Sequence, residues 1–174
     1  MIFEDKNDYQ TFQAAILKKV QKAPDAEVYI QLLTWNYIQQ QEFEMALRQL
    51  IAYDKRTKAD GGTLFNAIYT FVDNGAYETA IKAYDYLLTK GKDNQYYLPS
   101  KIEMLNTRYN LRTGGKYTAA DLDLLAKDYE ALLEENGRNR NTLFAIKKLA
   151  NLQAYYLNRP GSAEKQLEEA IKMP

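Results

Sequence analysis

The chain has 174 residues, with 23 basic and 23 acidic side chains and neither cysteine nor histidine. Its zero formal charge argues against nucleic-acid binding, which needs a surplus of Lys and Arg facing phosphates. The absence of Cys and His excludes thiol nucleophiles, imidazole bases, disulfides and ordinary zinc sites. No apolar run approaches the length of a membrane span, so we expect no membrane insertion.

The first predicted element is a single helix over residues 8–23. Tyr9, Phe12 and Ile16 form its apolar face, and Pro24 then stops it. This helix matches the second helix of the pairs that follow and has no partner before it. We therefore expect the chain to be a piece of a longer array.

Four helix pairs are predicted after this helix, and they span residues 25–59, 61–93, 95–137 and 141–174. The third pair is longer than the others, and the sequence from Thr118 to Asp121 predicts a capping box at the start of its second helix. In the fourth pair, Asn141 is the expected N-cap of the first helix. Pro160 and Gly161 are the expected turn between the two helices.

The apolar positions of these helices repeat at a fixed interval. Tyr9, Phe43 and Tyr77 are spaced 34 residues apart, and so are Ala46 and Ala80. Self-similarity at this period indicates a helical array. One helix pair cannot bury its apolar stripe alone, so stacked neighbours must complete the core.

The repeated residues resemble the tetratricopeptide repeat (TPR) family. The residues that match its second-helix pattern best are Gly75, Tyr77, Ala80 and Tyr84. The preceding copy matches through Leu33, Tyr37, Phe43 and Ala46, whereas Thr34 and Ile68 fill a position that is small in the family. The resemblance covers most of the chain and implies an all-α fold, a right-handed α-solenoid of antiparallel helix pairs.

The long, Tyr-rich repeats are also similar to large exported multi-TPR proteins of Gram-negative bacteria. That similarity implies a cell-envelope or periplasmic location and a role in assembly. The residues by themselves assign no compartment.

In a TPR array the first helix of each pair lines the inner, concave surface. The candidate partner-binding residues on this surface are Gln31, Trp35, Ile38, Gln39, Phe65, Tyr69 and Asp73. Trp35 and Tyr69 are 34 residues apart, so we expect them to be neighbours on one face. Aromatic side chains with polar tips suit peptide binding. The alternative, that each packs against the next repeat, stays open.

We therefore expect a non-enzymatic scaffold that binds a protein or peptide partner in this groove, with no catalytic residue, cofactor or metal. A structural alternative is a spacer or oligomerisation segment whose groove is empty and whose ends associate end to end. Glycan binding is a weaker alternative that rests only on exposed aromatic side chains.

Overall fold

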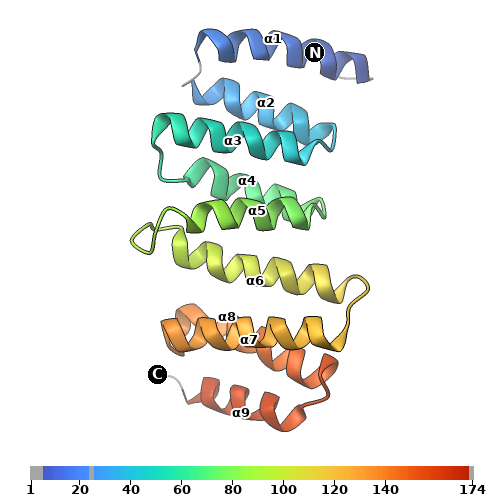
Figure 1. Ribbon diagram of the computed structural model, residues 1–174, viewed down its shortest axis with the longest axis vertical. Helices are drawn as coiled ribbons and strands as arrows, with labels where there is room; N and C mark the ends of the chain where they lie inside the picture. Colours follow the sequence, from blue (N-terminus) through green and yellow to red (C-terminus); the bar gives the residue numbers. More distant parts are fainter. Residues whose placement is uncertain (1–5, 24–25, 173–174) are drawn as a thin grey trace. The chain divides into compact units, whose positions relative to one another are not determined.

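The computed structural model describes residues 6–23 and 26–172, and within these residues it contains helices and no strand (Figure 1). Pro24, the predicted stop of the first helix, lies outside the described residues. So do residues 25, 173 and 174, which belong to the first and fourth predicted pairs. The chain divides into two compact units, one ending at Tyr97 and one starting at Leu98.

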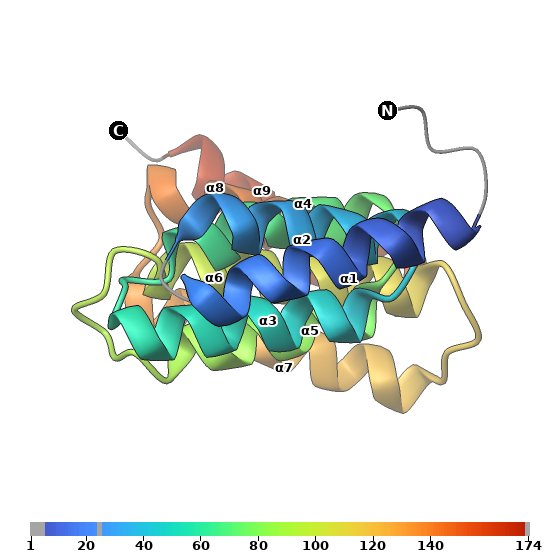
Figure 2. The same ribbon diagram turned by 90° about the horizontal axis from the view of Figure 1, so that it is seen from above.

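The first unit is a stack of antiparallel helices. Its elements are α1 (Lys6–Lys22), α2 (Glu27–Gln39), α3 (Phe43–Thr57), α4 (Gly62–Asp73) and α5 (Tyr77–Leu88). Helix α2 packs against α1 and α3, while α4 packs against α3 and α5. In Figure 2, α2 and α4 lie in one layer and α3 and α5 in the other.

The two hairpins of this unit have the same turn. Glu42 donates its N–H to the carbonyl of Tyr37 at 2.8 Å, and Ala76 does so to Phe71 at 2.9 Å, 34 residues later. The residue before each donor is left-handed, with φ of 59° at Gln41 and 73° at Gly75. Glycine adopts this conformation without strain, whereas Gln41 has a Cβ that opposes it. The sequence repeat is therefore also a repeat of backbone geometry.

The core of the unit comes from the repeated apolar positions. Ala46 and Ala80 are completely buried, and a small side chain at each lets neighbouring helices approach closely. The rings of Phe43 and Phe71 meet edge to face, with their centroids 6.1 Å apart. Such pairs are a preferred aromatic geometry in protein cores.

Two polar links join α3 to α5. Near the start of both helices, Glu44 accepts hydrogen bonds from Thr79 at 3.0 Å and Lys82 at 2.7 Å. Near their ends, the buried carboxylate of Asp54 accepts one from the Tyr86 hydroxyl at 2.6 Å. It also pairs with the Lys90 ammonium at 2.5 Å.

The second unit contains α6 (Tyr97–Thr113), α7 (Ala119–Asn136), α8 (Leu143–Asn151) and α9 (Pro160–Ile171). A 3₁₀ turn precedes α8 and a π-helical segment, Leu152–Tyr156, extends it. Three ion pairs link α6 to α7: Lys101 with Glu135, Arg108 with Asp128, and Arg112 with Asp121. The capping box predicted at Thr118 and Asp121 is present.

The fourth predicted pair differs from expectation at both turns. Asn141 is not the N-cap of α8 but lies in the 3₁₀ turn, which Asn139 caps by accepting the N–H of Asn141 at 2.9 Å. Thr142 occupies the N-cap position of α8. Pro160 and Gly161 do not form the turn but begin α9. Proline suits the first position of a helix, where no N–H is needed. The reversal lies before it, at Asn158, which is left-handed with φ of 51°.

Candidate functional site: a pocket between α2 and α4

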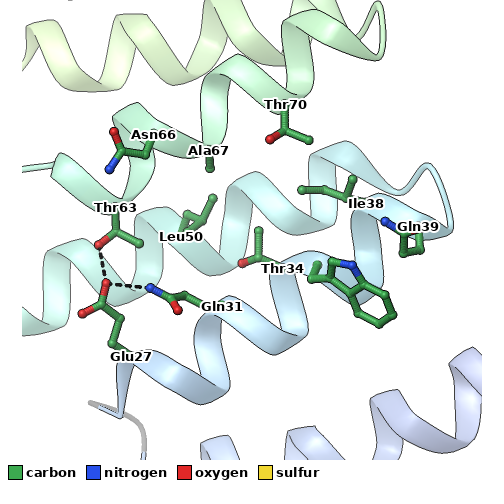
Figure 3. A pocket seen from close by; sticks show the side chains of 11 residues that line it. Glu27, Gln31, Thr34, Ile38, Gln39, Leu50, Thr63, Asn66, Ala67 and Thr70 are labelled. Carbon is green, nitrogen blue, oxygen red and sulfur yellow. Dashed lines mark hydrogen bonds between the residues drawn. The ribbon is translucent and has the colours of Figure 1, made fainter. Parts of the chain in front are cut away.

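A pocket of about 380 Å³ lies between α2 and α4 in the first unit (Figure 3). Its walls are formed by Glu27, Gln31, Thr34, Trp35, Ile38 and Gln39 from α2, by Leu50 from α3, and by Thr63, Asn66, Ala67 and Thr70 from α4. Within each wall, residues three or four apart recur, so each helix presents one face to the pocket. The pocket thus follows from the stacking of two successive hairpins.

An aromatic side chain dominates the apolar part of this pocket. Trp35 remains 40% exposed although its ring contacts Tyr9 and Phe12 of α1, at centroid distances of 6.2 and 6.1 Å. Helix α1 therefore holds the indole while leaving part of it accessible. Ile38 and Leu50 add aliphatic surface beside it. The result is a preformed apolar surface with one large aromatic group.

A hydrogen-bonded carboxylate lies at one end of the pocket. Glu27 Oε1 accepts hydrogen bonds from Gln31 Nε2 at 3.1 Å and from Thr63 Oγ1 at 2.9 Å (Figure 3). Because Thr63 belongs to α4, this contact also joins the two helices. Thr34 is buried in the wall, and its Oγ1 has no hydrogen-bond partner within the described part of the chain.

The predicted binding residues separate into two groups. Gln31, Trp35, Ile38 and Gln39 line this pocket, whereas the three predicted residues of α4, Phe65, Tyr69 and Asp73, do not.

The two aromatic residues of that second group differ in burial. Phe65 is only 8% exposed and packs against Tyr69, Tyr84 and Tyr96. Tyr69 is 49% exposed and contacts the Phe65 ring edge to face. Trp35 and Tyr69 are thus both accessible, but only Trp35 belongs to the pocket.

Sequence reasoning missed the wall contributed by α4, which consists of Thr63, Asn66, Ala67 and Thr70. The prediction chose positions that are equivalent in the sequence repeat, for example Gln31 on α2 and Phe65 on α4. Two parallel helices that enclose a groove use opposite faces, so the second wall lies at other positions of the helical period. Applying the period to the opposite face of α4 would have found these residues.

The second unit has its own pocket of about 550 Å³, lined by Leu98, Pro99, Ile102, Glu103, Asn141 and Phe144. Nearby, the ammonium of Lys148 lies 4.3 Å from the ring centroid of Tyr109 and 5.5 Å from that of Phe144. Burial, together with the neighbouring Tyr156, raises the pKa of Tyr109 to about 12. This region therefore combines aromatic rings with a cation.

Residues that could hold a metal ion do not cluster in the described ranges: no group of three or more His, Cys, Asp or Glu was found there. None of the described helices combines the length and the apolar character needed to cross a membrane.

No protein-family model matches the sequence, and no curated protein matches it significantly. Solved structures do resemble it. The crystal structure of MamA is 13% identical, covers 98% of this chain and 95% of its own, and superimposes with a TM-score of 0.57. A tetratricopeptide repeat protein from Parabacteroides merdae is 16% identical over 97% of this chain, with a TM-score of 0.49, and this chain spans 62% of its length.

Such low identity concerns the fold and not the activity. The consecutive helix hairpins, their shared turn geometry and the likeness to MamA define an all-α, TPR-like fold of the α-solenoid class. The fold class predicted from the sequence is confirmed.

Proposed function

We propose that this chain is a non-enzymatic scaffold that binds a segment of a partner protein in the pocket between α2 and α4. The observation that carries the proposal is the partly exposed indole of Trp35 beside Ile38 and Leu50, in a pocket already formed between two helices. Anchor residues at protein interfaces are enriched in tryptophan and fill or line such preformed pockets.

The polar part of the wall supports a peptide ligand. Gln31, Gln39 and Asn66 carry amide groups that can each donate to a carbonyl and accept from an N–H. A peptide backbone presents both kinds of group along its length. Amides around an apolar surface therefore suit an extended segment better than a purely apolar ligand.

A display library of random peptides, selected on the immobilised chain, tests this proposal. The affinity of the selected peptides is then measured by fluorescence anisotropy for wild type, Ala67→Tyr and Ala52→Tyr. Ala67 lies in the pocket wall, whereas Ala52 is exposed on α3 outside it. We expect Ala67→Tyr to weaken binding by about tenfold or more, since the new ring fills the pocket, a loss of about 1.4 kcal/mol.

The matched substitution at Ala52 adds the same side chain to the same chain and should leave the affinity unchanged. Circular dichroism checks that both variants keep the helical content of the wild type. Equal affinity of the two variants would remove this pocket from consideration as the binding site.

Self-association is a second candidate role, favoured by the exposed faces of α1 and α9. Helix α1 presents a shallow groove in which Ala14 and Ala15 are flanked by Lys18 and Lys22. On α9, Leu167 is 44% exposed and Ile171 83% exposed. Small and basic residues on one helix, and large apolar residues on the other, could pair between two copies.

A further inference from the structure

We infer that the pocket between α2 and α4 selects a peptide segment in which a tyrosine or tryptophan adjoins a lysine or arginine. This inference rests on the proposed function and specifies the chemistry of its partner. It follows from the charge, the hydrogen bonding and the exposed aromatic side chain of this one pocket.

Charge is distributed unevenly over the first unit. Helices α2 and α4 contain no Lys or Arg, and their charged residues are Glu27 and Asp73. The basic residues of the unit lie on the other helices, for example Lys18 on α1, Arg48 on α3 and Lys82 on α5, and in the loops, for example Lys90. The two helices that form the pocket are therefore purely acidic in a chain with no net charge.

Within the described residues, Glu27 is the one charged side chain of the pocket wall. Its two hydrogen bonds, from Gln31 and Thr63, fix the carboxylate at the rim. A carboxylate offers about four acceptor positions, so these two bonds leave capacity for a donor from a ligand. Hydrogen bonds from an ammonium or guanidinium to a carboxylate are the stronger, charge-assisted kind. A cationic residue of the ligand is the complement of this arrangement.

The interior of the pocket favours an aromatic side chain that carries a donor. The partly exposed ring of Trp35 offers a partner for an aromatic contact. Thr34 contributes a buried hydroxyl oxygen without a partner in the wall. Buried polar atoms in native proteins nearly always form a hydrogen bond. A phenol O–H or an indole N–H of the ligand would donate one to this oxygen.

An acidic segment is the disfavoured occupant. It would place like charges next to Glu27, with no cation on α2 or α4 to compensate. Like-charge contacts across an interface suppress wrong partners. The charge of the pocket thus acts on selectivity as well as on affinity.

Five synthetic peptides that differ at two positions test the inference: Tyr-Arg, Phe-Arg, Tyr-Gln, Tyr-Glu and Ala-Arg, within one otherwise identical backbone taken from the library selection. Affinities are measured by fluorescence anisotropy for wild type, Glu27→Gln, Glu42→Gln and Thr34→Val. Glu42 is exposed outside this pocket and serves as the matched control.

For the wild type we expect the order Tyr-Arg, then Tyr-Gln, then Tyr-Glu, with Ala-Arg weaker than Tyr-Arg. Glu27→Gln should weaken Tyr-Arg by about tenfold and leave Tyr-Gln unchanged, while Glu42→Gln alters neither. Thr34→Val should weaken the binding of Tyr-Arg more than the binding of Phe-Arg. Such a difference identifies a contact between the Thr34 hydroxyl and the phenol of the peptide.

The inference is overturned if Tyr-Glu binds as well as Tyr-Arg, or if Glu27→Gln lowers all affinities alike. Either result leaves the proposed function standing, provided that Ala67→Tyr still weakens the binding of these peptides by about tenfold or more. If Ala67→Tyr has no effect on any peptide, the proposed function itself fails.

Discussion

Asp54 is a buried charge whose partners come from α5 and from the loop that follows it. Its side chain is 4% exposed, and Tyr86 of α5 and Lys90, just after α5, contact the same carboxylate oxygen. Lys90 also donates to the carbonyl of Ala59 at 2.7 Å. Burial, and secondly the hydrogen bond to Asp54, raises the pKa of Tyr86. These contacts satisfy a carboxylate that would otherwise be costly to bury.

Asp54→Ala should lower the free energy of unfolding by about 3 kcal/mol, because it leaves the Lys90 ammonium partly buried without its anion. Urea denaturation followed by circular dichroism measures the change. Adding Lys90→Met to Asp54→Ala should recover much of the loss, since the uncompensated charge is then gone. A loss that persists undiminished in the double variant would contradict this account.

Glu44 provides the comparison for Asp54, because it links the same two helices at their other end. Its ion pair with Lys82 is largely exposed, at 45% and 59% for the two side chains. Exposed ion pairs contribute less than about 1 kcal/mol, so Glu44→Ala should have a small effect in the same assay. The difference between the two sites comes from burial, which the sequence alone does not reveal.

At the scale of single elements, the start of α7 is stabilised by a capping box that the sequence predicts. Thr118 Oγ1 accepts the N–H of Asp121 at 3.1 Å, and Asp121 accepts the N–H of Thr118 at 3.0 Å. The backbone hydrogen bond from Thr118 lowers the pKa of Asp121, with help from the Thr118 hydroxyl and the charge of Arg112. Thr118→Ala should destabilise the protein by about 1 kcal/mol.

The pH dependence of this cap has a definite sign. Because the pKa of Asp121 is lower in the folded state, its contribution is complete above the unfolded value of about 3.9 and is lost as the pH falls through the folded value. Asp121→Asn should therefore be less stable than wild type at neutral pH, and the difference should shrink in acid. Urea denaturation of both proteins at neutral and at acid pH measures this difference in stability. A difference that is the same at both pH values would refute the stabilising role of the Asp121 carboxylate.

Short sequence signals predicted the start of α7 correctly and the start of α9 wrongly. The capping box at Thr118 was predicted because both of its partners are three residues apart in sequence. The turn before α9 was misplaced because Pro160 and Gly161 are typical of turns, yet proline equally suits a helix start. The residue that reverses the chain, Asn158, carries a weaker signal.

For the whole molecule, the 34-residue recurrence was enough to predict the helix pairs of the first unit, since it encodes which faces must be buried together. The recurrence predicted the pocket wall on α2, which includes Gln31 and Trp35. It missed the wall on α4, because the face that α4 turns toward the pocket depends on how the hairpins stack. The unpartnered hydroxyl of Thr34 also depends on packing, which no short-range pattern records.

Association between copies is the prediction that belongs to this scale. Glu164, Leu167, Glu168 and Ile171 recur on one face of α9 at helical spacing, and on α1 Ala14, Ala15 and Lys18 lie in one groove. Pairing these two faces between copies would bury the exposed apolar side chains and oppose lysine to glutamate. Because the two faces differ, the contact is heterologous, so association should grow with concentration unless a ring closes.

Sedimentation velocity over a range of concentrations measures this association. Lys18→Glu or Glu168→Lys alone should shift the protein toward monomer, because each places like charges at the contact. The variant carrying both substitutions should associate again, since each interface then has its charges exchanged. This restoration separates a specific contact from a general change in surface charge. A wild-type protein that stays monomeric at all concentrations, or a double variant that fails to associate, would count against the pairing of α1 with α9.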